Sequence, residues 1–150
     1  MKLISTSIPL LGELNILSVA VRLLLAMICG GAIGYYRDKL NKEAGFRTHI
    51  LTCIGCAVTI LVGEYMFLLY PGVDPSRIGA QAISALGFLG AGTIIVSKSN
   101  HVTGLTTAAG LWTTAAVGLG CGAGFYELCI IATAAILISQ NILKTKLFPD

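Results

Sequence analysis

Few side chains in this sequence could do chemistry, and most of them lie within or beside long apolar runs. Glu64 and Asp74 offer carboxylate oxygens, and Arg77 and Gln81 follow Asp74 at helical spacing. Oxygen atoms are the ligands of hard cations such as Mg2+, which keeps several of its waters when it is bound. Asp74, Arg77 and Gln81 are therefore candidates for an ion-handling site.

Arg22 and Glu64 are charges that the surrounding apolar runs would carry to membrane depth. Each lies six residues inside the same end of its run, which is about 9 Å at the helical rise. A charge at the bilayer centre costs about 2.5 to 3.5 kcal/mol on insertion scales. A structural ion pair between antiparallel neighbours satisfies both charges. The alternatives are snorkelling of both side chains and a role in ion passage.

The sequence Asp-Pro-Ser-Arg at 74–77 is typical of a helix start. Asp74 is the expected N-cap and Pro75 the first helical residue, because proline lacks the amide hydrogen that a helix start leaves free. Gln81 lies one turn beyond Arg77, inside an apolar run, and needs a hydrogen-bond partner there. That partner is either a neighbouring helix or a ligand.

Gly87, Gly90 and Gly92 lie close together in the same apolar run as Gln81. Glycine weakens a helix by about 1 kcal/mol per residue relative to alanine. Unwound backbone at membrane depth is tolerated only where it lines a cavity or is buried in protein. Two interpretations stay open: a discontinuous helix that faces a substrate, and an intact helix with a neighbour packed against its glycines.

The elements that position these residues follow from the composition. Of 150 residues, 55% are hydrophobic and 11% are charged, and the mean hydropathy is +0.85. Soluble domains carry roughly 25% charged residues. A soluble domain, a disordered chain and a nucleic-acid binder are therefore excluded, and we predict an all-α polytopic transmembrane bundle.

Five largely neutral runs are long enough to cross a hydrocarbon core of about 30 Å as helices. They cover residues 16–36, 48–70, 78–97, 104–122 and 125–143, after an interfacial lead-in at 1–15 and before a short cytoplasmic tail at 144–150. Lys and Arg gather in the loops of one side, which predicts an external N-terminus and a cytoplasmic C-terminus. The basic side holds Arg37, Lys39, Lys42, Arg47, Lys98, Lys144 and Lys146.

Small residues indicate how such helices pack. Ala26, Gly30 and Gly34 recur every four residues, a spacing that lets two helix backbones approach closely. A tight hairpin around residues 118–124 is expected between the last two spans. Trp112 lies too deep for the interfacial aromatic belt, which predicts that its ring packs inside the bundle.

The cytoplasmic ends of the spans carry polar residues of their own. Arg37 follows the first span, Arg47, Thr48 and His49 open the second, and Thr106 and Thr107 open the fourth. The basic residues among them are expected to contact anionic lipid. His49 shares a helical face with Cys53 and Cys56, where either soft-metal ligation or simple packing is the interpretation.

Taken in order, six short motifs resemble those of the MgtC/SapB family of bacterial inner-membrane proteins. The resemblance covers about residues 22–124, some two thirds of the chain. The motifs are Arg22-Leu23-Leu24-Leu25-Ala26, Gly30-Gly31-Ala32-Ile33-Gly34 with Arg37, Ala44-Gly45-Phe46-Arg47-Thr48-His49, Asp74-Pro75-Ser76-Arg77-Ile78 with Gln81, Gly87-Phe88-Leu89-Gly90-Ala91-Gly92, and Gly104-Leu105-Thr106-Thr107-Ala108-Ala109 with Leu111-Trp112.

This resemblance implies a multi-pass protein of the bacterial inner membrane linked to magnesium homeostasis, with Mg2+ as ligand or substrate and no other cofactor. Some family members are regarded as regulators that bind other membrane proteins, including ATP synthase and cation pumps. Tyr36 stands where the family usually has Glu, and only a few residues follow Leu143, where many members have a C-terminal domain. The function is therefore expected to reside in the membrane part.

Two functions follow as hypotheses. The first is ion handling near Asp74, Arg77, Gln81 and the glycines of the third span, by a homodimer, because five spans are few for one pore. The second is a non-transporting regulator that docks on larger membrane complexes through its small-residue faces. An enzyme is not expected, since the sequence shows no nucleophile and base at plausible depth and no cofactor motif. Lipid is an expected partner and nucleic acid is not.

Overall fold

The computed structural model describes residues 13–70, 72–97 and 101–142, which form five helices and one short two-stranded ribbon. The predicted helical class is confirmed, but the ribbon begins inside the third predicted span, 78–97, whose last residues are therefore not helical. The helices are α3 (Ile16–Lys39), α4 (Phe46–Leu69), α5 (Ser76–Ala91), α6 (Leu105–Gly122) and α7 (Tyr126–Ile142), and the strands are β1 (Ile95–Val96) and β2 (Val102–Thr103).

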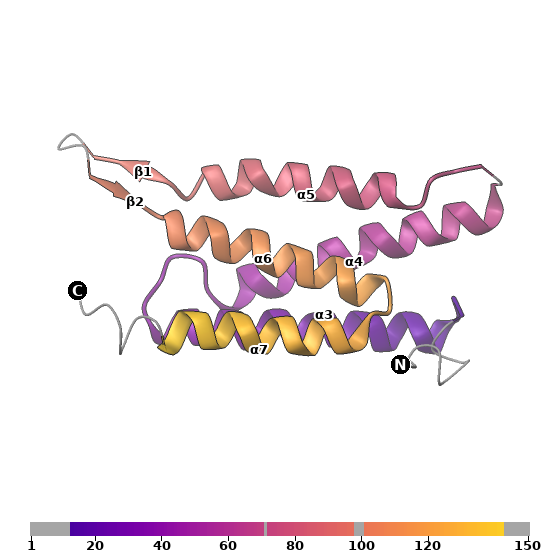
Figure 1. Ribbon diagram of the computed structural model, residues 1–150, viewed down its shortest axis with the longest axis horizontal. Helices are drawn as coiled ribbons and strands as arrows, with labels where there is room; N and C mark the ends of the chain where they lie inside the picture. Colours follow the sequence, from indigo (N-terminus) through magenta and orange to yellow (C-terminus); the bar gives the residue numbers. More distant parts are fainter. Residues whose placement is uncertain (1–12, 71, 98–100, 143–150) are drawn as a thin grey trace.

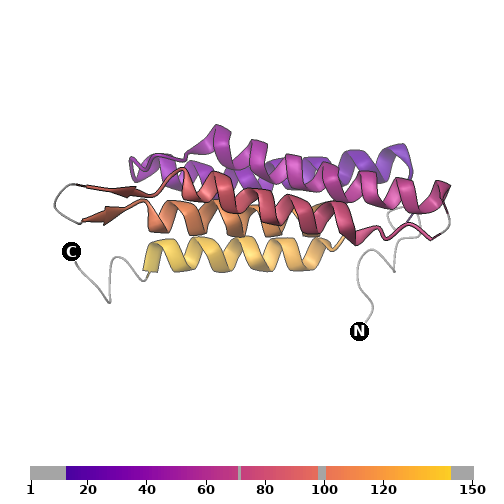
Figure 2. The same ribbon diagram turned by 90° about the horizontal axis from the view of Figure 1, so that it is seen from above.

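The five helices lie side by side along one long axis (Figure 1). One end of the bundle holds the α3–α4 loop, the β1–β2 ribbon and the last turn of α7, and we call it the basic end because Arg37, Lys39, Lys42 and Arg47 lie there. The opposite end holds the start of α3, the α4–α5 connection and the α6–α7 turn. α5 lies at the margin of the bundle in Figure 1, and the view from above shows it over α6 and beside α4, the two helices that it contacts (Figure 2).

Each predicted span corresponds to one described helix, with shifted ends. α3 and α4 have 24 residues each and are long and apolar enough to cross a membrane, and α7 is a shorter apolar helix. At 1.5 Å per residue, 24 residues reach about 36 Å, more than a hydrocarbon core needs. α5 differs most from expectation, because its helix ends at Ala91 and the chain continues into the ribbon.

Glycines set how closely α4 approaches its two main neighbours. A Cβ at Gly30 of α3 would lie 2.7 Å from the carbonyl oxygen of His49, and one at Gly34 would lie 2.7 Å from the Cα of Phe46. On the other side of α4, a Cβ at Gly122 of α6 would lie 2.4 Å from the carbonyl oxygen of Ala57. The predicted small-residue stripe therefore packs within this chain.

The last helical hairpin is tighter than predicted. Gly118, Gly120 and Gly122 belong to α6, and the turn to α7 is made by residues 123–125. Gly124 has a φ of 73°, a left-handed conformation that glycine adopts without steric cost. The turn is short because one such residue reverses the chain.

The prediction for Trp112 is wrong. Its side chain is 48% exposed on the outside of α6, beside α7, instead of packing inside the bundle. In lipid the outside of a bundle is as apolar as its core, so the depth of an aromatic ring does not say which way it faces.

Candidate functional site

Several charged and polar side chains of this bundle are buried while many large apolar ones are exposed, which is unusual for a soluble protein. Arg22 and Arg37 are each 2% exposed and His49 is fully buried, whereas Leu51 and Ile131 are 70% and 67% exposed. Charged side chains are almost never buried without partners. The buried polar residues fall into two groups, one near each end of the bundle.

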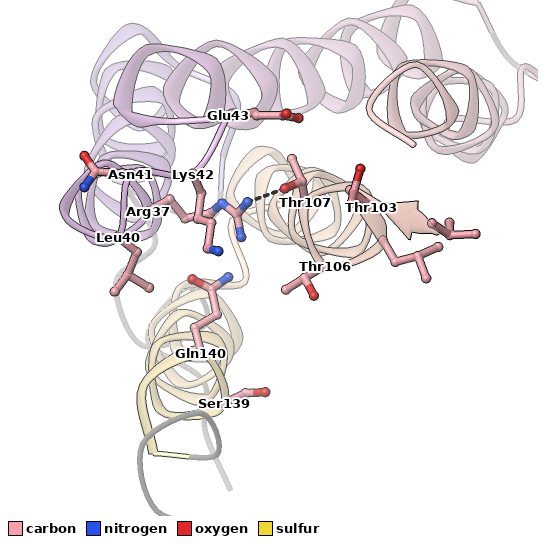
Figure 3. Close-up of a pocket in the computed structure, with 13 residues that line it drawn as sticks. Arg37, Leu40, Asn41, Lys42, Glu43, Thr103, Thr106, Thr107, Ser139 and Gln140 are labelled. Atoms are coloured by element: carbon pink, nitrogen blue, oxygen red, sulfur yellow. Dashed lines mark hydrogen bonds between the residues drawn. The ribbon is translucent and has the colours of Figure 1, made fainter. Parts of the chain in front are cut away.

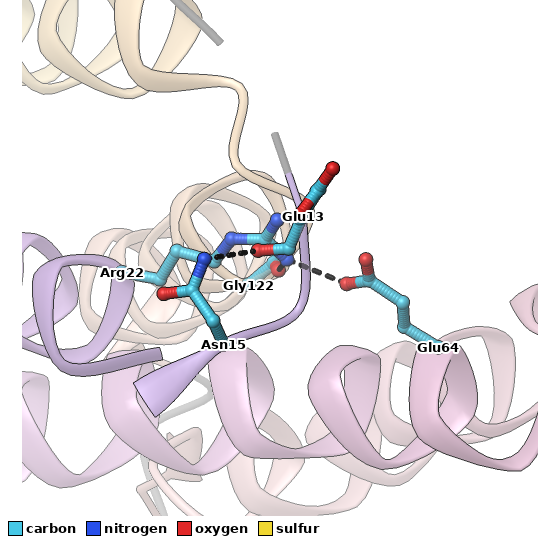
Figure 4. A network of polar contacts seen from close by, with 5 residues as sticks. All are labelled: Glu13, Asn15, Arg22, Glu64 and Gly122. Carbon is cyan, nitrogen blue, oxygen red and sulfur yellow. Dashed lines mark hydrogen bonds and ion pairs between the residues drawn. The ribbon is translucent and has the colours of Figure 1, made fainter. Parts of the chain in front are cut away.

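The first group is centred on Arg22 and confirms the predicted ion pair. Nη1 of Arg22 donates to Oε2 of Glu64 at 2.5 Å and to the carbonyl oxygen of Gly122 at 3.0 Å, so one nitrogen joins α3, α4 and α6 (Figure 4). Gly124 lies against the same guanidinium, and a Cβ there would lie 3.1 Å from Nε. Because Glu64 is engaged by Arg22, its carboxylate has a structural role in this conformation.

The second group is centred on Arg37 at the basic end. Its Nε donates to the carbonyl oxygen of Ala44 at 3.2 Å, and its Nη2 donates to Oγ1 of Thr107 at 2.5 Å (Figure 3). Arg37 therefore links the end of α3 to the α3–α4 loop and to the first turn of α6. Among the described residues, it has no carboxylate within ion-pairing distance.

His49 lies beside Arg37 and is fully buried. Its Nδ1 lies 2.7 Å from the hydroxyl oxygen of Thr114, and the same oxygen lies 2.8 Å from the carbonyl oxygen of Gly110. The hydroxyl has one proton, so it donates either to Gly110 or to Nδ1, and the tautomer of the ring follows from that choice. Nε2 is buried and has no hydrogen-bond partner among the described residues.

A cavity of about 710 Å³ opens beside Arg37. Its walls are the α3–α4 loop at 40–43, the start of α6 with the residues before it at 102–107, and Ser139 and Gln140 of α7. The side chains of Arg37, Lys42 and Gln140 point toward one another in it (Figure 3). Three segments that are far apart in sequence thus meet in one polar cavity.

The other residues predicted at the cytoplasmic ends of the spans lie at the basic end but outside this network. Arg47 and Thr48 are exposed, as is Thr106, which lines the cavity. Cys53 and Cys56 are buried in the core. Within residues 13–70, 72–97 and 101–142, no three His, Cys, Asp or Glu side chains are arranged to hold a metal ion.

The candidate ion-handling residues are not gathered into a cavity. Asp74 is fully exposed before α5, and Arg77 and Gln81 are exposed along the helix. Oδ1 of Asp74 accepts hydrogen bonds from the amide of Ser76 at 2.9 Å and from its hydroxyl at 2.7 Å, so Asp74 satisfies the first amide of α5. The predicted positions are wrong by one residue, because the N-cap is Pro75 and the first helical residue is Ser76. These hydrogen bonds from Ser76, with a smaller contribution from Arg77, lower the pKa of Asp74 from its usual value.

The glycines of the third span do not interrupt its helix. α5 is continuous through Gly87 and Gly90, and the chain leaves it at Gly92, before the ribbon begins at Ile95. A Cβ at Gly90 would meet Ala108 of α6 at 3.6 Å, whereas a Cβ at Gly87 would meet nothing within 4 Å. Of the two interpretations, the intact helix is the observed one, and of these two glycines Gly90 faces a neighbour.

Sequence reasoning missed Gly110, Thr114 and Gln140. A Cβ at Gly110 would lie 3.7 Å from Nε2 of Gln140, 3.8 Å from Cε1 of His49 and 3.9 Å from Nη1 of Arg37, so the three side chains surround one point. The signal for Gln140 was present, since an amide in an apolar run needs a partner in the same way as that of Gln81. No sequence signal separates Thr114 from the other threonines of α6.

Comparison with known proteins identifies relatives. The profile of the MgtC family matches residues 23–147. YhiD of Escherichia coli K12, whose name provisionally describes a magnesium transporter, is 46% identical over 127 residues, which cover 81% of this chain and 59% of YhiD. Protein MgtC of Brucella abortus is 40% identical over 119 residues, covering 79% and 48% of the two chains.

A Gram-positive relative extends the match. Protein SapB of Bacillus subtilis is 37% identical over 140 residues, which cover 88% of this chain and 60% of SapB. The chain therefore spans about half to three fifths of the length of these relatives. No solved structure matches it.

Proposed function

Because the chain belongs to the MgtC family, we propose that it is a multi-pass protein of the bacterial inner membrane that takes part in magnesium homeostasis. The name of its relative YhiD supports the link to magnesium. The observation that carries the membrane location is that Arg22, Arg37 and His49 are buried while Leu51 and Ile131 face outward. Only a lipid environment favours that arrangement of side chains.

The proposed topology has five spans, with the basic end in the cytoplasm. Its support is the excess of Lys and Arg at that end. Labelling of introduced cysteines tests it, because all five native cysteines are buried. In sealed cells an impermeant thiol reagent should label Glu13→Cys, and should label Asn41→Cys only after permeabilisation. Labelling of both variants in sealed cells contradicts the topology.

For the ion-handling role, the relevant surface is the outer face of α5. Arg77, Gln81 and Ser84 are exposed there, and Gln81 has no hydrogen-bond partner among the described residues. An unsatisfied polar group in hydrocarbon costs several kcal/mol. We therefore infer that protein, and not lipid, covers this face, and that the covering protein is a second copy of the chain.

Such an interface would bring two copies of Asp74 and Gln81 into one membrane region. Mg2+ keeps several of its bound waters, so its binding site needs oxygen atoms that accept hydrogen bonds from those waters more than oxygens that bind the ion directly. The side-chain oxygens of Asp74 and Gln81 can act in this way. The positive charge of Arg77 offsets part of the negative charge of Asp74, so the cation is held weakly. Weak binding is required for the cation to be released on the other side of the membrane. The cation would then pass between copies, and not through the interior of one bundle.

Flux into proteoliposomes tests this role with two variants of one residue. Asp74→Asn keeps an oxygen that can cap α5 and removes the charge, whereas Asp74→Ala removes both. If the charge handles the ion, both variants should lose Mg2+ uptake to a similar extent, while Asp74→Asn stays folded and is more stable than Asp74→Ala. Wild-type protein that moves no Mg2+, or Asp74→Asn with full uptake, contradicts ion handling at Asp74.

The second candidate is a regulator that binds another membrane complex, and one observation restricts it. Gly30 and Gly34 are covered by α4, so a partner has to use another surface, and the open space at Gly87 on α5 offers one. Gly87→Leu should abolish copurification with that partner. Gly55→Leu is the matched control, since a Cβ at Gly55 also meets nothing within 4 Å. Equal copurification of both variants contradicts docking on α5.

A further inference from the structure

We propose that the cavity at the basic end binds a phosphate group. This cavity lies between the α3–α4 loop, the first turn of α6 and the last turns of α7, and it is distinct from the outer face of α5. The proposal therefore does not rest on cation transport. It rests on a helix start with free amides and on a buried guanidinium whose Nη1 makes no hydrogen bond to any described residue.

The start of α6 supplies the first set of donors. Gly104 precedes this 18-residue helix with a φ of 87°, and it has no side chain to cap the helix. The first amide with a helical acceptor is that of Ala108, which donates to the carbonyl oxygen of Gly104 at 2.9 Å. The amides of residues 105–107 thus have no partner in the described part of the chain, and residues 104–107 line the cavity. Free amides at the positive end of a helix dipole favour an anion.

Only glycine can take the position before α6. A Cβ at Gly104 would lie 1.8 Å from the carbonyl oxygen of Thr93, so the chain packs against the segment after α5 at this point. A left-handed residue followed by helical ones also turns successive amides to the same side, which forms a concave anion site in other proteins. The conformation that leaves the amides free is therefore fixed by packing.

Arg37 is the second and independent observation. Its side chain is 2% exposed, and its Nε and Nη2 are held by Ala44 and Thr107. Nη1 makes no hydrogen bond to any described residue and faces the cavity beside Gln140. A buried guanidinium that is fixed in position but lacks a carboxylate partner is incompletely neutralised. A phosphate oxygen at Nη1 would complete it, in the charge-assisted geometry that arginine favours.

Gln140 of the cavity lining also has an unsatisfied atom. Its Oε1 is buried without a hydrogen-bond partner among the described residues. Its Nε2 and Nη1 of Arg37 both lie within 4 Å of the Cβ position of Gly110, so the two side chains are neighbours. Because Oε1 accepts a hydrogen bond, a bound water or the hydroxyl of a monoprotonated phosphate would satisfy it.

Size and charge define the ligand further. A volume of about 710 Å³ exceeds what one phosphate fills and falls within the range of small-molecule sites. Lys42 adds a positive charge to that of Arg37, and Glu43 is the negative residue of the lining. The ligand class is therefore a phosphate with a substituent, which comes either from the headgroup of an anionic phospholipid or from a soluble phosphate compound.

The experiment measures binding to the purified full-length protein. One arm titrates inorganic phosphate into protein in neutral detergent. It measures the thermal stability of the protein and the heat of binding. The other arm compares thermal stability in nanodiscs of phosphatidylglycerol with that in nanodiscs of phosphatidylcholine. Stabilisation by inorganic phosphate identifies a soluble phosphate, and stabilisation by phosphatidylglycerol alone identifies the headgroup. No effect in either arm overturns the proposal.

Variants separate the cavity from general surface charge. Lys42→Gln should weaken binding several-fold and Glu43→Gln should strengthen it, since the charges change in opposite directions. Arg37→Gln should weaken binding about tenfold or more, because charge-assisted hydrogen bonds to a buried guanidinium are lost. If Arg37→Gln fails to fold, Gly110→Ala replaces it: its Cβ would have ordinary contacts of 3.7 to 3.9 Å and would take up space beside Nη1 of Arg37 and the amide of Gln140.

Gly55→Ala is the control for Gly110→Ala, because both add one methyl group to a helix and Gly55 faces open space. Gly110→Ala should weaken binding while Gly55→Ala leaves it unchanged. Binding that responds equally to Lys42→Gln and to Arg47→Gln, an exposed basic residue outside the cavity lining, would show a diffuse surface effect and overturn the assignment.

Discussion

Arg22 of α3 and Glu64 of α4 form an ion pair at 2.5 Å, and the same nitrogen of Arg22 also donates to the backbone of α6 at Gly122. The guanidinium is 2% exposed and the carboxylate side chain 31%. Three helices are thus joined by one side chain at the end of the bundle opposite to the proposed phosphate site.

Removal of one partner of this pair should destabilise the protein more than removal of both. Glu64→Ala leaves a buried positive charge, and we expect a loss of about 1 to 3 kcal/mol after allowing for the partial exposure of Glu64. The double variant Arg22→Met with Glu64→Leu should recover part of that loss. Reversible unfolding in mixed micelles measures both, and a double variant less stable than Glu64→Ala would contradict a mainly structural pair.

Gly30 is expected to be intolerant of a side chain. A Cβ there would lie 2.7 Å and 2.8 Å from backbone and side-chain atoms of α4, so Gly30→Ala should destabilise the bundle by about 1 to 3 kcal/mol through overpacking. Gly55→Ala on the open face of α4 should be neutral or slightly stabilising. Thermal unfolding of the two variants compares them directly. Equal stability would mean that α3 and α4 do not pack as described.

Gly124 should be sensitive for two separate reasons. Its φ of 73° is strained for alanine, and a Cβ would also lie 3.1 Å from Nε of Arg22. Gly72 has a φ of 92° with nothing within 4 Å, so Gly72→Ala carries the backbone strain alone. We expect Gly124→Ala to lose about 1 to 2 kcal/mol from strain and a further amount from the contact. If both variants lose the same stability, the contact with Arg22 has no energetic effect.

The cap of α5 should depend on pH. Hydrogen bonds from Ser76 lower the pKa of Asp74 in the folded protein from its ordinary value of 3.8, so the carboxylate stabilises the fold above that value. This contribution is lost as the pH falls below 3.8 and through the lower folded value. Unfolding between about pH 5 and pH 2 should therefore show a smaller loss of stability for Asp74→Asn than for wild type. Identical pH profiles would contradict the cap.

Cross-linking tests the second copy on α5. Gln81→Cys should form a disulfide-linked dimer in the membrane under a mild oxidant, because a covered face brings the two copies of one residue together. Val62→Cys on α4, where the native side chain is 45% exposed, is the matched lipid-facing control and should not cross-link. If Gln81→Cys also stays monomeric, another partner covers this face.

The sequence alone predicted the number and order of the helices in the described part of the chain, and it offered the Arg22–Glu64 pair as one of three interpretations. A long apolar segment predicts a membrane helix, because in lipid the backbone N–H and C=O groups must form their hydrogen bonds within that segment. Depth is counted along one helix from its end, so two charges at equal depth on antiparallel neighbours could be matched without a structure. The resemblance to the MgtC family could also be seen in the sequence, because each of its motifs is a short run of neighbouring residues. The family match over residues 23–147 confirms it.

Only the tertiary structure decided which way each helix faces. Trp112 faces outward and Gly30 inward, although both lie in apolar segments, because lipid and protein core are equally apolar and leave no amphipathic pattern to read. Arg37, Thr107 and Gln140 come from three distant segments, and their meeting in one cavity follows from the packing of α6 against α3 and α7. The sequence determines which residues each helix contains, and close packing at the glycines determines which residues of the neighbouring helices they contact.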